Sequence, residues 1–479
     1  MRIERRWWAL TVVVMAQFMF GLDAFIVNVA LPAIGDNLRT TPAELEAVVA
    51  IYFIGYGTLV ITGGRLGDLY GTKNIFVLGV LGFTLSSLWC GLAGSGTMLV
   101  LARFVQGAAG ALMIPQVLGT IHLQFGDRHR ARAFGIYGMA LGLAAASGFL
   151  IGGLLLWLDV AGLGWRAIFF VNVPFGIAIA AAAIGVMQNA PSKSGVLLDI
   201  PGVLVLFVGL SCIIGPLLFG RDLDWDMRVW ATMATGFVIL VIFAKFELRV
   251  AARGGMPLMN MELFQNAVFA RGLCATFSFA FGNLSFYLAM TLYAQGVLGM
   301  SPLQTGVLFM GPALVFVVAA QHSGIRSVHR GTLVLIEGCL VQMVGLLGLG
   351  ATFSTMSPGV SPIEIFLVVF AYGQGMVMAP LSSAVLAGID GRHASVASGI
   401  YVTVSQIGNA AGVAAVGAIY FALNATAHHS IKLLASLAVI ALATIACASM
   451  VAWMRSATSK PDPEPRAGVR DGPTQPVRR

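Results

Sequence analysis

The stretch GGRLGDLYGTKN, Gly63 to Asn74, lies between two apolar runs at about 47–64 and 75–94. It places an acidic and a basic side chain, Asp68 and Lys73, at the facing ends of those runs, and its glycines suit a tight turn. Opposite charges at neighbouring helix ends can hold the helices together in one state and release them in another. The stretch therefore predicts a short turn between two helices, with a contact that changes during a working cycle.

The composition is that of a membrane protein. Of the 479 residues, 58% are hydrophobic and only 10% are charged, whereas a soluble domain has about 25% charged residues. Five cysteines lie singly inside apolar runs, without a CxxC pair or a histidine cluster beside them. We therefore expect neither a disulfide framework nor a zinc site.

Fourteen runs are long enough to cross a membrane, because about 20 apolar residues span a hydrocarbon core of about 30 Å. The first run is too long for the hydrophobic part of a signal peptide, and no small-residue cleavage site follows it, so we expect it to stay in the mature protein. The runs cover approximately 8–31, 47–64, 75–94, 98–120, 133–156, 167–187, 200–219, 228–246, 267–292, 303–320, 332–352, 363–386, 398–422 and 432–454.

The basic residues predict the orientation. With the N-terminus inside, 22 of the 28 lysines and arginines fall in inner segments, five fall in outer loops, and Arg103 falls within a run. Because cytoplasmic loops carry an excess of basic residues, we expect an integral protein of the bacterial cytoplasmic membrane with both termini in the cytoplasm. The formal net charge of +8 then follows from topology, and we expect no nucleic-acid partner.

Two long inner segments divide the chain, one after the sixth run and one after the eighth. We predict an all-α integral membrane fold of fourteen transmembrane helices, arranged as two six-helix bundles plus two linker helices. The first bundle covers residues 1–187, a linker with two extra transmembrane helices covers 188–253, and the second bundle covers 254–455. Residues 456–479 are rich in proline and charge, which predicts a disordered cytoplasmic tail.

The turn at Gly63–Asn74 carries a family resemblance. Its pattern GxLxDxxGxK, from Gly64 to Lys73, resembles the loop signature of the major facilitator superfamily. An ordinary polar turn is the alternative, but it does not require this spacing. The resemblance implies that four residues of the turn govern conformational switching: Gly64, Asp68, Gly71 and Lys73.

Two further stretches resemble motifs of the same superfamily. LARFVQGAAGALMIP, residues 101–115, resembles the fourth-helix motif, with Arg103 and Gln106 in its positions. GLAAASGFLIGG, residues 142–153, resembles the fifth-helix antiporter motif, except that Phe149 stands where a proline is usual.

Three stretches are similar to one branch of the superfamily, the drug:proton antiporters with fourteen helices. LDAFIVNVALP, residues 22–32, resembles the first-helix motif of that branch, with Phe25 in place of a usual threonine. WRAIFFVNVPFG, residues 165–176, and YAQGVLGMSPLQTG, residues 293–306, are also similar to it. The resemblance extends from residue 7 to about 450 and implies multidrug or antibiotic efflux.

Asp23 lies near the middle of the first run, about 22 Å along a helix from Trp8. A carboxylate in hydrocarbon is costly, and burial disfavours its charged form. We interpret Asp23 as a residue that binds a proton or a cationic substrate, with Asn28 beside it. The alternative is a helix-packing carboxylate that is paired with an arginine or neutralised by burial.

Arg103 and Gln106 lie in the fourth run. A buried arginine needs acceptors, and backbone carbonyls or Gln106 can supply them. The resemblance implies that Arg103 takes part in proton coupling, whereas a structural clamp between helices is the alternative. The sequence does not show whether Asp23 and Arg103 meet.

Glu337 is a third ionisable candidate, about 8 Å inside the inner end of its run. It follows Arg330 by seven residues, so an ion pair along the chain or snorkelling to the interface explains it without a transport role.

The fifth run is rich in glycine, which lets helices approach closely. A packing seam is one interpretation, and the resemblance adds that this seam, where the bundles meet, controls leak. The residues concerned are Gly142, Gly148, Gly152 and Gly153.

Aromatic and amide side chains offer an adaptable surface for lipophilic or cationic compounds. Further candidates for the lining of a central cavity are Phe25, Tyr52, Tyr56, Asn283, Tyr287, Tyr372, Gln374 and Gln406.

These features predict a proton-coupled secondary transporter that exports lipophilic, often cationic, drugs by alternating access of two bundles. We expect it to work as a monomer, driven by the proton motive force, without another cofactor. A narrow exporter of one metabolite or self-made antibiotic is the alternative. An integral-membrane enzyme or receptor is a hypothesis of another class, but the sequence lacks the residue sets that catalysis needs, so we predict no enzyme.

Overall fold

The computed structural model describes residues 2–125, 127–188, 199–220, 223–255, 257–259, 261–354, 360–387, 389, 394–422 and 429–458. Throughout these residues the regular structure is helical, with no strand. Thirteen helices are long and apolar enough to cross a membrane, and the apolar part of α5, Gly142–Leu158, supplies one more crossing. The predicted all-α fold with fourteen transmembrane helices is confirmed.

The first bundle contains α1 to α7, where the short α6 and α7 together form the sixth crossing. These helices are α1 (Arg2–Leu38), α2 (Pro42–Tyr70), α3 (Thr72–Gly91), α4 (Gly96–Gln124), α5 (Asp127–Leu158), α6 (Ala167–Phe170) and α7 (Asn172–Val186). Two 3-10 turns, η1 (Val160–Gly162) and η2 (Gly164–Arg166), connect α5 to α6.

The two extra helices follow, and then the second bundle. The extra helices are α8 (Ile200–Phe219) and α9 (Met227–Ala252), and η3 (Met261–Gln265) leads into the second bundle. The second bundle comprises α10 (Ala267–Gly296), α11 (Pro302–Arg330), α12 (Leu333–Phe353), α13 (Val360–Leu386), α14 (Ala394–Ala422) and α15 (His429–Thr458).

The second helix of each bundle begins with the same local chemistry. Thr41 Oγ1 accepts a bond from Glu44 N, and the Glu44 side chain accepts one from Thr41 N, which forms a capping box. Ser301 and Gln304 repeat this arrangement at the start of α11. Each box satisfies backbone N–H groups that a helix start leaves unpaired, with proline in the following position.

The bundles meet along two helix pairs. In the first bundle α2 and α3 pack on α4, and α1 packs on α5; in the second, α12 and α11 pack on α13, and α14 and α15 pack on α10. Between the bundles, α5 packs on α11 and α2 packs on α14. α1 also contacts α10 across the boundary between the bundles.

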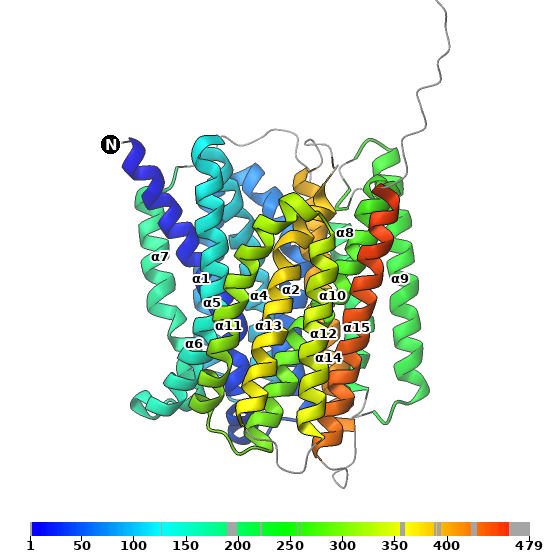
Figure 1. The fold of residues 1–479 in the computed structure, drawn as a ribbon. Coiled ribbons are helices and arrows are strands. Elements are labelled where there is room, and N and C mark those ends of the chain that lie inside the picture. The colour runs from blue at the N-terminus through cyan, green and yellow to red at the C-terminus, as the bar shows by residue number, and fades with distance from the viewer. Residues whose placement is uncertain are drawn as a thin grey trace, which may run out of the picture.

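The extra helices lie outside the bundles, at the side where α2 meets α14 (Figure 1). α8 packs on α9 and also touches α2 and α14, whereas α9 is largely exposed at the edge of the molecule. The start of α1 and the end of α15 lie on the same face, as an even number of crossings requires (Figure 1). The exact domain boundaries stay predictions, and the segments 189–198 and 459–479 lie outside the described residues.

The turn between α2 and α3 is a single residue. α2 ends at Tyr70 and α3 begins at Thr72, so Gly71 alone joins them, with a φ of +89°. Side chains rarely adopt this backbone conformation, which explains a glycine at this position.

Candidate site around the buried ion pair

Asp23 lies in the middle of α1 with its side chain fully buried, and it forms an ion pair with Arg103 of α4. The distance between Arg103 Nη1 and Asp23 Oδ2 is 2.5 Å, and both side chains are 0% exposed. The two residues that the sequence left unrelated therefore meet. The arginine that neutralises Asp23 comes from another helix.

Two amide groups hold the other oxygen of this carboxylate. Gln106 Nε2 and Asn172 Nδ2 donate to Asp23 Oδ1 at 2.9 and 2.8 Å. Both amides also donate to Ser87 Oγ, at 3.1 and 3.0 Å, and Ser87 Oγ donates to Phe169 O at 3.0 Å. Because an ionised carboxylate accepts and does not donate, the arrangement matches the charged form of Asp23.

Arg103 makes further contacts within the first bundle. Its Nε donates to Val48 O at 3.1 Å, and its Nη1 donates to Gln106 Oε1 at 2.7 Å. The guanidinium carbon lies 4.1 Å from the centroid of the Tyr52 ring, which is a cation–π contact. The remaining nitrogen, Nη2, is buried and has no hydrogen-bond partner among the described residues.

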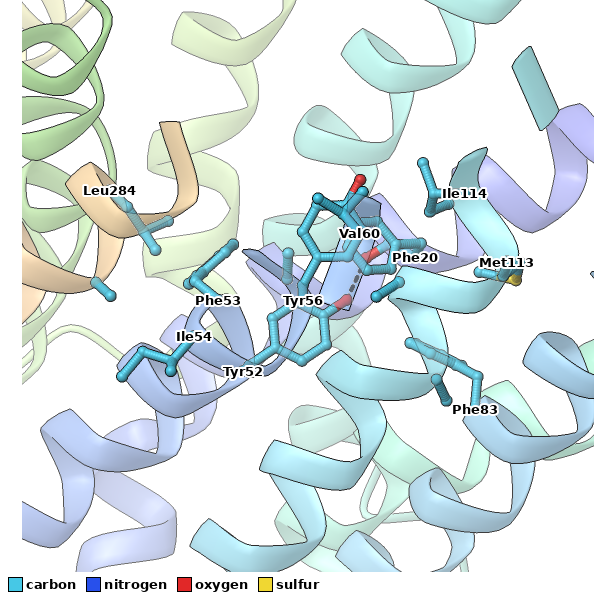
Figure 2. Close-up of a cluster of buried hydrophobic side chains, with 14 of the residues drawn as sticks. Phe20, Tyr52, Phe53, Ile54, Tyr56, Val60, Phe83, Met113, Ile114 and Leu284 are labelled. Carbon is cyan, nitrogen blue, oxygen red and sulfur yellow. Dashed lines mark hydrogen bonds between the residues drawn. The ribbon is translucent and has the colours of Figure 1, made fainter. Parts of the chain in front are cut away.

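A buried group of rings contacts Arg103 through Tyr52. Figure 2 shows three of these rings, Phe20, Tyr52 and Tyr56. Tyr52 OH donates to Phe20 O at 3.3 Å, and the Phe20 ring lies 5.4 Å from the Tyr52 ring and 4.8 Å from the Tyr56 ring. All three side chains are buried. Tyr52 and Tyr56, which we predicted to line a cavity, are enclosed in the first bundle in this structure.

A second group of rings joins the two bundles, and we call it the ring cluster. It consists of Phe25 of α1, Phe149 of α5, Tyr287 of α10 and Phe309 of α11. Phe149 lies 5.6 Å from Phe25, 5.1 Å from Tyr287 and 4.8 Å from Phe309, measured between ring centroids. The two positions at which the sequence departs from the family motifs, Phe25 and Phe149, are thus in contact.

The polar groups near the ring cluster are uncharged. Tyr287 OH donates to Gln374 Oε1 at 3.0 Å, and Gln374 Nε2 donates to Asn283 Oδ1. Of the predicted cavity residues, the structure therefore brings together Asn283, Tyr287 and Gln374.

Gln406 lies at the contact between α2 and α14. A Cβ atom added to Gly57 of α2 would lie 2.9 Å from Gln406 Cβ, and Gln406 Oε1 accepts a bond from Asn409 Nδ2 at 3.0 Å. Gln406 is therefore at the junction of the two bundles, apart from the ring cluster.

Three predicted residues form contacts elsewhere. Asn28 is buried, and its Nδ2 donates to Ala24 O at 3.1 Å within its own helix, so it does not join the Asp23 network. Tyr372 OH lies 2.7 Å from His322 Nδ1 of α11. Glu337 forms ion pairs with Arg326 and Arg330, both at 2.7 Å.

We call the stretch Gly63–Asn74 the family turn. Its residues contact other helices of the first bundle. Lys73 Nζ donates to Ile184 O near the end of α7 at 2.6 Å. A Cβ atom on Gly64 would lie 3.7 Å from Pro115 Cβ of α4, which is ordinary contact. Asp68 also has a partner, so the turn is engaged with its surroundings in this state.

The glycines of α5 face two different helices. A Cβ atom added to Gly148 would lie 2.8 Å from Phe25 Cβ, and one added to Gly152 would lie 3.0 Å from Ile26 O, both in α1. On the other side, Gly142 meets Val317 of α11, and a Cβ atom on Gly153 would lie 2.6 Å from Pro302 O. α5 therefore packs closely on α1 through Gly148 and Gly152, and across the bundle boundary on α11 through Gly142 and Gly153.

Sequence reasoning missed Asn172 and Ser87 as members of the site. Asn172 lies in the stretch WRAIFFVNVPFG, which we singled out only for its resemblance. The signal in the sequence was an amide side chain inside the apolar run at 167–187, and the structure buries Asn172 to 1% exposure at the start of α7. Ser87 offered no comparable signal.

The described residues contain no group of three or more histidine, cysteine, aspartate or glutamate residues that could hold a metal ion. The interactions that the described side chains form at the site are an ion pair and hydrogen bonds.

Known proteins are similar to this chain over most of its length. The family model described as Major Facilitator Superfamily matches residues 13–413. The "Probable actinorhodin transporter" of Streptomyces coelicolor is 34% identical over 429 residues, which cover 88% of this chain and 73% of that protein. The "Tetracenomycin C resistance and export protein" of Streptomyces glaucescens is 31% identical over 418 residues, covering 86% and 76%.

Solved structures show the same fold. The inward-open xylose transporter XylE from E. coli has a TM-score of 0.65 at 14% identity, over 96% of this chain and 98% of that chain.

Proposed function

This chain belongs to the major facilitator superfamily, and we propose that it is a proton-coupled efflux transporter in which Asp23 carries the coupled proton. Its relatives in the antibiotic and multidrug export group identify it as an efflux transporter. The proposal concerns the driving ion, the residue that binds it and the substrates.

The observation that carries the proposal is the buried pair of Asp23 and Arg103. When a proton neutralises Asp23, the pair loses its attraction and Arg103 is left charged in an apolar surrounding, which is unfavourable. A state in which the Arg103 guanidinium reaches another acceptor then has the lower free energy. Proton binding at Asp23 therefore changes the relative free energies of two states, which is what coupling requires.

The second state would arise by movement at the contacts between the bundles. α5 and α11 touch through Gly142 and Gly153, and α2 and α14 touch at Gly57 and Gln406. Rocking of one bundle against the other would separate these contacts on one side of the membrane and keep them on the other. The ring cluster contains rings from both bundles. Those rings must therefore separate when the bundles move apart on their side of the membrane.

We propose lipophilic small molecules as substrates, bound by the rings and by the uncharged groups of Gln374 and Asn283. In this structure Arg103 forms an ion pair with Asp23. A cationic compound therefore has to compete with Arg103 for the carboxylate. Arg103 Nη2, the buried donor without a partner among the described residues, suits an acceptor oxygen of a substrate. We therefore expect neutral compounds with acceptor groups to be exported alongside cations.

A narrow exporter of one metabolite or self-made antibiotic is the second candidate. The names of the two Streptomyces relatives each refer to one compound, which supports this candidate, whereas the 28% identical "Multidrug resistance protein Stp" of Mycobacterium tuberculosis supports broad export. The breadth of the substrate range distinguishes the two.

The experiment is an antibiotic susceptibility panel in an efflux-deficient bacterium that expresses the wild type, Asp23→Asn or Asp226→Asn. Asp226 is an exposed residue at the start of α9 and serves as the matched loss of a carboxylate. We expect the wild type and Asp226→Asn to raise the tolerance to at least one compound, and Asp23→Asn to raise none. Equal tolerance with Asp23→Asn, at equal amounts of protein in the membrane, would refute the proposed role of Asp23.

Substrate charge is tested with three compounds that share one ring system: 9-anthracenemethanol, 9-anthracenecarboxylate and 9-aminomethylanthracene. Fluorescence titration of the protein in nanodiscs measures their affinities. We expect the neutral compound to bind at least as tightly as the ammonium compound. Binding of the ammonium compound alone would show that Asp23 is open to cations and that the ion pair does not shape selectivity.

A further inference from the structure

The two extra helices meet at their inner ends around Gly202 of α8. Asp199 caps the start of α8, and its Oδ1 accepts a bond from Gly202 N at 2.9 Å. Glu247 lies near the end of α9 and is fully buried. A Cβ atom added to Gly202 would meet Asp199 Oδ2 and would lie 2.6 Å from Glu247 Oε1. The two carboxyl groups therefore face each other across this glycine.

These carboxyl groups hold the segment that leads into the second bundle. Leu258 N donates to Asp199 Oδ2 at 3.3 Å, and Met259 N donates to Glu247 Oε2 at 2.8 Å. The preceding residue, Pro257, accepts a bond at its carbonyl oxygen from Arg65 Nη2. We call this set of bonds the clip: three consecutive residues are held by side chains of α2, α8 and α9.

The clip connects parts of the chain that are expected to move relative to each other. Arg65 belongs to α2 of the first bundle and lies within the family turn, next to Gly64. Residues 257–259 precede η3 and α10, where the second bundle begins. A rocking motion of the bundles at this face must either stretch the clip or carry the extra helices along.

The carboxyl groups have an unsatisfied atom between them. Glu247 Oε1 is buried and has no hydrogen-bond partner among the described residues. Within the described chain neither Asp199 nor Glu247 forms an ion pair, although both act electrostatically on nearby Arg65. Two carboxylates at close range cannot both be ionised without strong repulsion, and a proton on one lets it donate to the other.

We propose that Asp199 and Glu247 bind one proton between them, as a second protonation site at the inner face that keeps the clip closed. With the proton in place, one carboxyl group donates to the other and the unsatisfied oxygen gains a partner. When the proton leaves, the two carboxylates repel each other and their hold on Leu258 and Met259 weakens. The closed clip is thus present at lower pH and is lost as pH rises.

Arg65 is the charged group that acts electrostatically on the two carboxyl groups, and the elements around the pair carry a few others. Arg65 and Asp68 come from α2, Glu262 comes from η3, and Lys245 and Arg249 lie on α9 itself. The described residues of α14, which packs on α8, carry no charged side chain. After proton loss, Arg65 of α2 would attract the two carboxylates. Their hydrogen bonds to the amides of residues 258 and 259 would weaken at the same time.

Infrared difference spectroscopy of the protein in nanodiscs at pH 7 tests the shared proton. We expect the difference between wild type and Glu247→Gln to contain a lost C=O band of a protonated carboxyl group. Asp226→Asn is the control and should lose only carboxylate absorption, because Asp226 is exposed. If Glu247→Gln and Asp199→Asn each remove only carboxylate absorption, both groups are ionised and the proposal is wrong.

Hydrogen–deuterium exchange of the peptide containing Leu258 and Met259 tests the clip. We expect Glu247→Gln, which resembles the protonated form, to keep wild-type protection and to reduce its dependence on pH. Glu247→Ala should speed exchange of the Met259 amide about fivefold, as the loss of one hydrogen bond predicts. Unchanged exchange in both Glu247→Ala and Arg65→Ala would show that the clip does not hold this segment.

Discussion

The centre of the first bundle and the centre of the second differ in one physical property, their charge. Asp23 and Arg103 form a fully buried ion pair in the first bundle, held by amide donors from α4 and α7. The corresponding polar groups of the second bundle, Asn283, Tyr287 and Gln374, are neutral and hydrogen bonded to one another.

This difference in charge indicates different roles for the two bundles. A buried ion pair changes its free energy strongly when one partner takes up a proton, whereas amides and a phenol remain neutral near physiological pH. We infer that proton binding is a task of the first bundle and that the second bundle contributes mainly to substrate binding. The ring cluster lies where the two meet.

The largest effect is expected from Arg103→Ala. It leaves Asp23 buried without its partner, and breaking a buried pair in this way costs about 3–5 kcal/mol. We expect the free energy of unfolding to fall by this amount and export to be lost, as measured by thermal unfolding in nanodiscs and by vesicle transport.

The double variant Asp23→Asn/Arg103→Gln is the control for this prediction. It removes both charges, so much of the stability should return while export stays absent. If Arg103→Ala is no less stable than Gln374→Ala in the second bundle, the two centres do not differ as we describe.

A substitution in the family turn should lower the transport rate without changing substrate binding. Asp68→Asn removes a charge at the end of α2 that leads into α3, whereas Asp23 lies in the middle of α1. We expect the transport rate to fall several-fold while equilibrium binding of the same substrate is unchanged, since the turn affects only the change of state. Parallel loss of binding would place the turn in the substrate site.

The ring cluster should affect affinity without affecting the dependence on pH. Phe149→Leu removes a ring that we propose packs against a bound aromatic substrate, and one such ring contact is worth about 0.5–1.5 kcal/mol. We expect weaker binding of aromatic substrates, by about tenfold, and an unaltered change of affinity with pH. A changed pH dependence would mean that the cluster takes part in proton coupling.

The smallest effect is expected from Tyr287→Phe. It removes one hydroxyl group and its bond to Gln374, which contributes about 1 kcal/mol. Affinity for substrates that use Gln374 should change about fivefold or less, in either direction, as titration will show. A loss of export comparable to that of Arg103→Ala would remove the contrast between the bundles.

Much of the architecture could be predicted from the sequence because the membrane restricts the possibilities. Apolar runs of sufficient length must be helices, and the turn at Gly63–Asn74 is specific to the family. The predicted run at 303–320 nevertheless underestimates α11, which continues to Arg330. A helix can extend beyond the hydrocarbon with polar residues, which hydropathy does not detect.

The site was predictable only where a residue is costly in hydrocarbon. Asp23 and Arg103 stand out in apolar runs, and Gln106 follows from the fourth-helix motif. Asn172 was missed because an amide near a helix end carries little penalty, yet it donates directly to Asp23. Asn28 was included by its position on α1, but its amide bonds to its own helix backbone. Which face of a helix meets which neighbour depends on packing, and the sequence does not state it.

The most direct test of the central claim counts protons at substrate binding. Purified protein in weakly buffered solution with a pH indicator receives a substrate identified in the susceptibility panel, and the substrate affinity is measured across pH. A substrate that binds the ionised form of Asp23 more tightly than the protonated form releases protons at pH values at which part of the protein is protonated. For one exchanged proton, linkage then predicts an affinity that rises by up to about tenfold per pH unit. We predict both for the wild type and for Gln374→Ala, and neither for Asp23→Asn. Proton release by Asp23→Asn equal to that of the wild type would contradict the account.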